Sequence, residues 1–252
     1  MKTRLLSLAS ILCATLLHAE GPDISSWSIT VKGGIAYPVL GEFSGSAGEQ
    51  TSSSTDDEGN VTTTGNNANI NSLSWDDAFK DFMNFAVELD FWEGSSRSLY
   101  FGVSRTQATG KTTNLGTYNG SGVSATFSDY SDVGLYAGFR WGLGQPASWI
   151  KSLISVQAGA TIVDGIDAQV TNIPNYSKIG IYKNTTAFSA GAFVSIIITP
   201  LEFFEIGIDS GFQYQTGLDG DNSQLELLGL NGINSEGQLG LVPVRILATI
   251  KF

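Results

Sequence analysis

The sequence alternates strictly between two kinds of position near its start. Between Trp27 and Tyr37, every odd position is apolar or glycine, while the even positions carry Ser, Thr, Lys, Gly and Ala. Successive side chains of a β-strand point to opposite faces, so this period predicts a strand with one apolar face. Such a strand, about ten residues long, is what a tilted crossing of a bilayer requires.

The same alternation returns along the rest of the chain. The predicted strands are residues 27–37, 83–91, 99–104, 132–141, 154–162, 188–198, 204–213 and 242–252. Their apolar rows contain no charged residue, whereas the opposite rows carry Gly, Ser, Thr and charged side chains. A soluble β-sandwich would instead turn its polar rows outward. The pattern therefore favours an all-β fold, a transmembrane up-and-down antiparallel β-barrel of eight strands.

The segments between these strands alternate in length. Short links built around Gly, Pro and Ser are residues 93–98, 142–152 and 199–203, and long polar links are residues 38–81, 105–129, 163–186 and 215–238. This arrangement is typical of a barrel with short periplasmic turns and long extracellular loops. We interpret the low-complexity run from Ser44 to Asn71 as a mobile surface loop. Residues 179–183 and 225–233 could extend strands or add a hairpin, which leaves a count of ten open.

Aromatic residues lie at both ends of the predicted strands. The periplasmic set is Trp27, Trp92, Trp141, Phe204 and Phe252, and the extracellular set is Tyr37, Phe82, Tyr130, Phe188 and Tyr214. Aromatic side chains are enriched at membrane–water interfaces. We therefore expect both sets to form girdles on the outside of the barrel.

The first residues are predicted to be a secretory signal peptide. Lys2 and Arg4 precede an apolar stretch that is too short to span a bilayer as a helix. Cleavage is expected between Ala19 and Glu20, which leaves residues 20–252 as a single barrel domain. The only cysteine and the only histidine leave with this segment, and the loss of Lys2 and Arg4 moves the formal charge from −11 to −13.

The composition of the predicted mature chain argues against several function classes. Its acidic balance opposes nucleic-acid binding, which needs clustered Lys and Arg. The sequence contains no glycine-rich nucleotide loop and no metal-ligand cluster, and we expect no cofactor. Enzymes on small membrane barrels resemble one another in needing a histidine, and general-base chemistry near neutral pH favours imidazole. We therefore expect a protein that is not an enzyme.

The last strand carries the residues that connect the chain to a family. It ends on Phe252, preceded at every second position by Ile250, Ala248 and Ile246. With the signal peptide and the repeated amphipathic strands, this terminus resembles bacterial outer-membrane barrels of the small OmpA and opacity type. The resemblance implies outer-membrane localisation and insertion by the barrel-assembly machinery, with these four residues as the assembly signal. It also implies outer-membrane lipid and lipopolysaccharide as partners.

Parity places charged side chains inside the predicted barrel. The interior polar cluster consists of Lys32, Glu88, Asp90, Asp132, Arg140, Glu205, Asp209 and Arg245. The interior of a barrel of about eight strands is narrow enough for side chains to fill, and buried charges need partners. We interpret the cluster as a salt-bridged plug, with a narrow gated ion path as the alternative. On the surface, Asp219 and Asp221 are weak candidates for a cation site, because alternate Asp side chains can converge on a hard cation.

These observations predict a non-enzymatic outer-membrane barrel that acts as a structural or surface-interaction component. The first alternative is a small-solute porin. The second is an adhesin that binds an extracellular ligand or a host surface through its loops, with its affinity in residues 41–75. The oligomeric state stays open.

Overall fold

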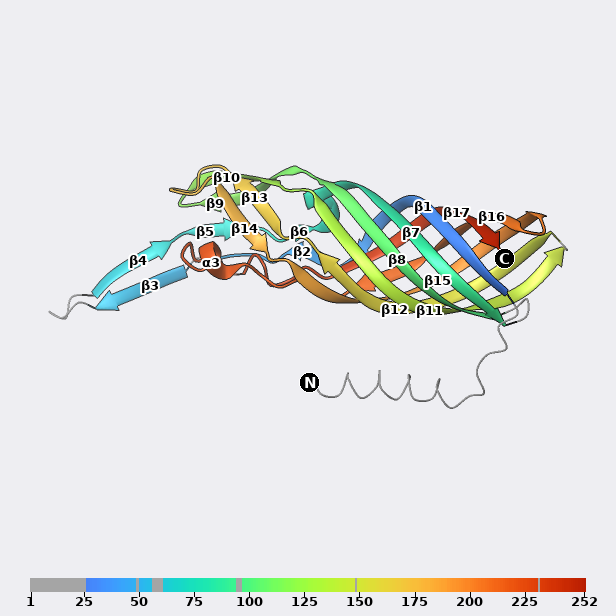
Figure 1. Ribbon diagram of the computed structural model, residues 1–252. Helices are drawn as coiled ribbons and strands as arrows, with labels where there is room; N and C mark the ends of the chain where they lie inside the picture. The colour runs from blue at the N-terminus through green and yellow to red at the C-terminus, as the bar shows by residue number, and fades with distance from the viewer. Residues whose placement is uncertain (1–25, 49, 56–60, 94–96, 148, 231) are drawn as a thin grey trace.

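The computed structural model describes residues 26–48, 50–55, 61–93, 97–147, 149–230 and 232–252. Among these residues, eight antiparallel strands close into a barrel (Figure 1). They are β1 (Ser26–Leu40), β7 (Phe79–Glu93), β8 (Arg97–Gly110), β11 (Tyr130–Ala147), β12 (Ile150–Val163), β15 (Thr185–Leu201), β16 (Phe204–Gln215) and β17 (Leu239–Lys251). The predicted fold class and strand count are confirmed. The predicted cleavage site at Ala19 and Glu20 lies outside the described residues.

The first and last strands meet to close the barrel. Val31 of β1 lies opposite Val87 of β7 on one side and opposite Ala248 of β17 on the other. Below this seam, the backbone N–H of Phe252 donates to the carbonyl oxygen of Trp27 at 2.9 Å, and the two rings stack with centroids 4.1 Å apart. Because the sheet is closed, the barrel has no unpaired edge.

The exterior of the barrel is apolar and its interior is polar. The outward side chains of Val31, Leu135 and Ile208 are more than half exposed, whereas the neighbouring Lys32 and Asp209 are buried. The predicted assignment of the two faces is therefore confirmed. An apolar surface that runs around a whole barrel is far larger than the patches found on soluble monomers.

Three of the predicted girdle aromatics lie inside the barrel instead. Trp92, Phe82 and Tyr130 are buried, whereas Trp27, Trp141, Phe252, Tyr37 and Phe188 are exposed. The three buried residues occupy the inward parity of their strands, which continues further toward the strand ends than the sequence analysis assumed. The prediction of an outer girdle was wrong for these three positions.

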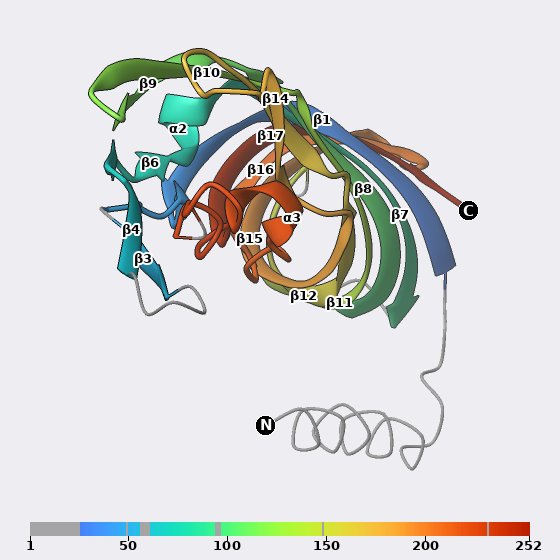
Figure 2. The ribbon, with the colours of Figure 1, turned by 90° about the vertical axis from the view of Figure 1, so that its left-hand side faces the viewer.

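The long links are not the polar loops that the sequence predicted. They form a sheet of five strands, β14 (Lys178–Tyr182), β13 (Ile166–Val170), β10 (Ser121–Phe127), β9 (Thr112–Tyr118) and β5 (Ala68–Ile70), beyond one end of the barrel (Figures 1 and 2). Two further pairs join β2 (Glu42–Ser44) to β6 (Leu73–Ser74) and β3 (Gln50–Thr55) to β4 (Val61–Asn66). We call the described parts of residues 41–78, 111–129, 164–184 and 216–238 the cap.

A hydrophobic core holds the cap together. Phe43 is fully buried, and its ring contacts those of Trp75, Phe79, Phe127 and Tyr182 at centroid distances of 5.1, 5.0, 5.0 and 5.6 Å. These rings come from three of the long links and from the start of β7. Edge-to-face contacts at such distances add to the stabilisation from burial itself. The cap is therefore packed like a soluble domain.

Short helices fix two corners of the cap. Ser74 begins α2 (Trp75–Ala78) with a capping box, in which Ser74 Oγ accepts from the Asp77 N–H at 3.3 Å and Asp77 Oδ2 accepts from the Ser74 N–H at 3.2 Å. This turn directs Trp75 inward, where its indole N–H donates to the Gln238 carbonyl oxygen at 2.7 Å. The second helix is α3 (Asn222–Leu225). No helix among the described residues has the length and apolarity to cross a bilayer.

Two ambiguous segments are resolved by the cap. Residues 179–183 largely coincide with β14. Leu225 ends α3, and the described residues between it and Ile233 form mainly turns. Neither adds a strand to the barrel. The run from Ser44 to Asn71, predicted as a mobile surface loop, contains β3, β4 and β5.

Candidate functional site

Lys32 lies at the centre of the barrel lumen. Its position on the inward row of β1 directs its Nζ to Glu88 Oε1 of β7 and to Asp209 Oδ2 of β16, each at 2.9 Å. All three side chains are shielded from solvent. The Lys32 ammonium therefore links β1 to β7 on one side and to β16, beyond β17, on the other. Buried charges need such contacts with opposite charges, because the interior of the barrel has a low dielectric constant.

Two arginines extend this contact into a continuous network. Arg140 pairs with Glu88 at 2.6 Å and with Asp90, and Arg245 binds both oxygens of Asp209 at 2.8 Å. We call Lys32, Glu88, Asp90, Arg140, Asp209 and Arg245 the lumen network. Its three cations and three carboxylates balance, so the interior carries these charges without a net excess.

Aromatic side chains fill the space beside the lumen network. The guanidinium carbon of Arg140 lies 4.5 Å from the centroid of the Tyr100 ring, and that of Arg245 lies 4.7 Å from the centroid of the Phe193 ring. These separations are within the range of cation–π attraction. The hydroxyl of Tyr136 donates to Glu88 Oε1 at 3.1 Å. Together with the ion pairs, these rings occupy the middle of the lumen.

Inward glycines make room for the tyrosines. A Cβ atom at Gly102 would lie 2.4 Å from Cζ of Tyr136, and one at Gly138 would lie 2.5 Å from Cζ of Tyr100. Real Cβ atoms do not approach other atoms so closely. The alternation of glycine and large residues on the inward rows therefore has a packing cause, as expected in a narrow barrel.

A second group of charges lies nearer the end of the barrel opposite the cap. Glu205 pairs with Lys151 at 2.7 Å and with Lys251, and Lys151 Nζ lies 4.9 Å from the centroid of the Trp92 ring. Lys151 was not predicted inside the barrel, because the sequence pattern indicated a turn over residues 142–152. In the structure β12 begins at Ile150, and parity on that strand would have placed Lys151 inside.

Asp132 is the predicted interior carboxylate that joins no ion pair among the described residues. Its two oxygens accept hydrogen bonds, one from the Tyr130 hydroxyl at 2.6 Å and one from the Thr106 N–H at 3.1 Å. The expectation that every interior charge has an oppositely charged partner was therefore wrong here. Two hydrogen bonds take the place of a cation.

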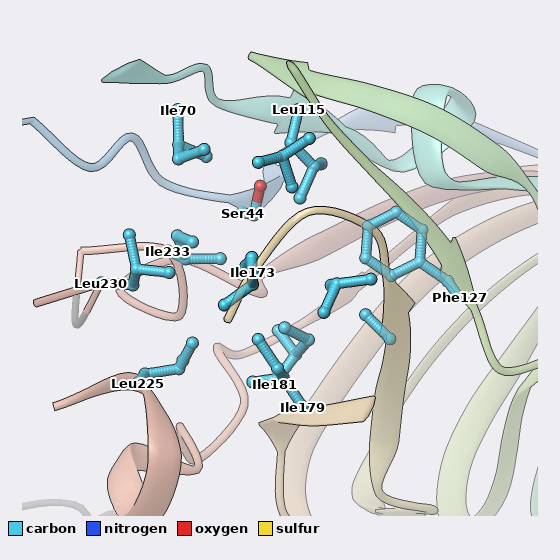
Figure 3. A pocket seen from close by; sticks show the side chains of 13 residues that line it. Ser44, Ile70, Leu115, Phe127, Ile173, Ile179, Ile181, Leu225, Leu230 and Ile233 are labelled. Carbon is cyan, nitrogen blue, oxygen red and sulfur yellow. The ribbon is translucent and has the colours of Figure 1, made fainter. Parts of the chain in front are cut away.

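The cap encloses a small apolar cavity of about 20 Å³, shown in Figure 3. Apart from Ser44, its lining residues are apolar and come from all four long links. This volume is about what one water molecule occupies, and an apolar cavity offers water no hydrogen-bond partners. The cavity is a gap in the packing of a core.

A larger, open groove lies where the cap joins the barrel. Its volume is about 490 Å³, and its walls combine the exposed Val39 and Leu40 with the carboxylates of Glu42, Asp76 and Glu236. The groove lies at the rim of the barrel, where the outward row of β1 continues from the exposed Tyr37 to Val39.

The predicted cation residues hold local structure. Asp221 Oδ1 accepts from the Ser223 N–H at 3.1 Å and begins α3. Hydrogen bonds from the side chain and the backbone of Ser223 lower the pKa of Asp221. The Asp219 N–H donates to Thr185 Oγ1 at 3.0 Å. Across the described residues, no group of three or more His, Cys, Asp or Glu side chains could hold a metal ion, and the cation site stays a prediction.

The residues of the predicted assembly signal lie on the outward face of β17. Ile246, Ile250 and Phe252 are well exposed, and Ala248 is partly exposed in the same row. The signal they are predicted to form thus lies on the surface that faces away from the lumen.

Tyr182 shows how the cap is sealed from solvent. Its hydroxyl donates to the Phe43 carbonyl oxygen at 2.5 Å, and the ring belongs to the cap core. Burial raises the pKa of the Tyr182 hydroxyl well above its ordinary value. The phenol therefore stays protonated under ordinary conditions and remains a hydrogen-bond donor.

No protein-family model and no curated protein matches the sequence. Among solved structures, the chain is similar to Neisserial surface protein A, with 10% identity, 90% of this chain and 97% of that chain covered, and a TM-score of 0.41. For Ail, the attachment invasion locus protein of Yersinia pestis, the identity is 10%, the coverage 90% and 98%, and the TM-score 0.41. For Outer Membrane Protein W of E. coli these values are 16%, 89% and 97%, and 0.34.

Proposed function

We propose that the chain is a non-enzymatic barrel of the bacterial outer membrane, closed in its lumen, that serves as a structural and surface-interaction component. The observation that carries this proposal is the combination of an apolar exterior with a charge-balanced lumen network beneath a folded cap. An apolar exterior suits lipid, and a filled lumen suits a scaffold better than a conduit. Lipid, lipopolysaccharide and the barrel-assembly machinery are the partners that it implies.

The membrane part of the proposal is tested with the purified protein. In detergent it should show β-type circular dichroism, and unheated samples should migrate differently from boiled samples on a gel, because the closed barrel resists unfolding. A monomer that stays soluble without detergent would contradict the membrane location.

The closed lumen separates this proposal from a small-solute porin. The lumen network and the rings of Tyr100, Tyr136 and Phe193 are buried in the middle of the barrel. In planar bilayers, we expect the protein to produce no conductance steps of the size that a general porin gives. Regular porin-like steps would favour the channel alternative.

A second candidate function is adhesion, and the ribbon of β3 and β4 favours it. This ribbon extends away from the barrel beyond the rest of the cap (Figure 1). It lies within residues 41–75, the part of the chain predicted to hold the affinity. Deletion of residues 50–66 should lower attachment of expressing bacteria to host cells while heat-modifiable migration is retained. Unchanged attachment would contradict a role for the ribbon.

A further inference from the structure

One outward row of the barrel breaks the apolar pattern. On β8, the exposed Phe101 and Val103 are followed at the next outward position by Arg105, which is also exposed. The neighbours of Arg105 across the sheet are Phe85 of β7 and Val133 of β11, both exposed and apolar. A guanidinium therefore projects from an otherwise apolar part of the outer wall. The strand predicted from the sequence ended at residue 104 and did not include Arg105.

Arg105 has no ionic partner within the described part of the chain. The ion pairs found there involve Lys32, Arg140, Lys151, Lys178, Arg245 and Lys251. A charged side chain on a lipid-facing surface is costly unless it reaches the interface or an opposite charge. The structure surrounds Arg105 with apolar side chains and gives it no carboxylate, so an anionic partner from outside the protein would stabilise its charge.

The position of Arg105 along β8 corresponds to the outer edge of the apolar band. Arg97 and Arg105 both point outward, at opposite ends of one apolar row. At the usual rise and tilt of a membrane strand, these positions lie roughly 20 Å apart across the membrane, close to the height of the apolar band. The two ends differ in one respect. Arg97 lies opposite Glu93 of β7, whereas Arg105 lies opposite Phe85.

The outward row of β8 becomes polar above Arg105, although the exposed Met83 of β7 lies opposite Gln107. Gln107 and Thr109 continue the outward row of β8, and the exposed Lys80 of β7 lies opposite Thr109. A ligand seated here would meet apolar side chains below, a guanidinium at the boundary and hydrogen-bonding groups above. An amphiphile with acyl chains and an anionic headgroup has this order of chemistry.

We propose that Arg105, with Lys80 above it, binds the phosphate group of a lipid in the outer leaflet. A guanidinium presents two parallel N–H donors that match the oxygens of a phosphate. The acyl chains would lie over Phe85, Val103 and Val133. This site rests on the proposed membrane location, and it would fix the height and rotation of the barrel relative to the surrounding lipid.

The test compares two arginines on the same strand. The full-length protein is purified in an uncharged detergent, and binding of diphosphorylated lipid A is measured by native mass spectrometry. Arg105→Gln should raise the dissociation constant about fivefold, the loss expected for one basic residue at a lipid surface. Arg105→Lys should lose less, because it keeps the charge. Arg97→Gln, the matched control at the other end of the row, should bind like the wild type.

Several outcomes would overturn the site. Equal dissociation constants for the Arg105→Gln and Arg97→Gln proteins would show that Arg105 is not a binding residue. Release of the lipid by inorganic phosphate at the same concentration would show a site for free phosphate and not for a lipid. Heat-modifiable migration of each variant confirms its fold, so failure of this site is distinguishable from failure of the proposed barrel in the membrane.

Discussion

Lys32 is the residue on which the lumen network depends most. Its ammonium is the link between Glu88 and Asp209, and both contacts are closed to solvent. Replacing it with Met removes one charge from a balanced set and leaves a net negative charge buried in the lumen. We expect Lys32→Met to lower the free energy of unfolding by about 3–5 kcal/mol, measured by urea titration in lipid vesicles.

A surface ion pair provides the control for this prediction. Lys178 and Asp167 approach to 2.7 Å in the cap, with side chains 63% and 41% exposed. Exposed pairs contribute about 0–1 kcal/mol, because water screens them and the side chains lose entropy. Lys178→Met should therefore change stability little. If both substitutions cost the same, burial is not what makes the lumen network important.

The outward rows permit a second prediction for a single residue. Ile208 lies midway along β16, more than half exposed, between Ile196 of β15 and Ile246 of β17. Ile208→Arg should destabilise the protein in a bilayer by about 2–4 kcal/mol, the cost of a cation near mid-membrane. Thr117→Arg, at an exposed position of the cap, should change stability by less than about 0.5 kcal/mol. Equal costs would refute the assignment of the outer face.

The alternation of residues along each strand was enough to predict many of the side chains that face the lumen. Lys32, Glu88, Asp209 and Arg245 were predicted to share the lumen, and they contact one another as a network. What parity does not give is which inward side chains reach one another between strands that are not paired. The contact of Lys32 on β1 with Asp209 on β16, which lies beyond β17 in the closed sheet, depends on strand stagger and side-chain length.

At the scale of elements, the cap core permits a prediction that leaves the barrel intact. Phe43 is fully buried among four aromatic rings. Phe43→Ala should destabilise the cap by about 3–5 kcal/mol, because the cavity left behind cannot collapse completely. Hydrogen exchange should then accelerate at the amides of β10 and β13 and stay slow in β12 and β15. Leu227→Ala, at a side chain that is 73% exposed, is the control.

The cap also shows why elements outside the membrane escaped the sequence analysis. Barrel strands alternate apolar and polar residues over many positions, so each strand can be predicted from its own sequence. The cap core instead collects apolar residues such as Phe43, Phe127 and Ile166 from separate links that are mostly polar or glycine-rich. Alternation does occur in these links, as at Val123, Ala125 and Phe127 of β10, but it spans at most seven residues. The apolar cluster exists only after the strands have brought the links together.

At the scale of the whole molecule, the surface of the barrel is suited to lipid and that of the cap to water. The barrel turns its apolar side chains outward and closes around ion pairs, as a protein surrounded by lipid should. The cap turns its apolar side chains inward, as a protein in water should. The boundary between these two patterns runs near Tyr37, Arg105 and Phe188, which are exposed residues toward the cap ends of β1, β8 and β15. Insertion must therefore place one half of the molecule in each environment.

Because insertion must place the barrel in lipid and the cap in water, we expect assembly of the protein in the membrane to depend on Phe252. Its ring stacks on Trp27, and its N–H closes the seam between the first and last strands. Trp27→Ala removes the ring stack but keeps Phe252, whereas deletion of Phe252 removes both. Comparing the two variants therefore separates packing at the seam from recognition of the assembly signal. Deletion of Phe252 should reduce the amount of heat-modifiable protein in the outer membrane of expressing cells much more than Trp27→Ala does, while both proteins refold into vesicles after purification. Equal losses in cells would mean that Phe252 acts through packing at the seam and not as part of an assembly signal.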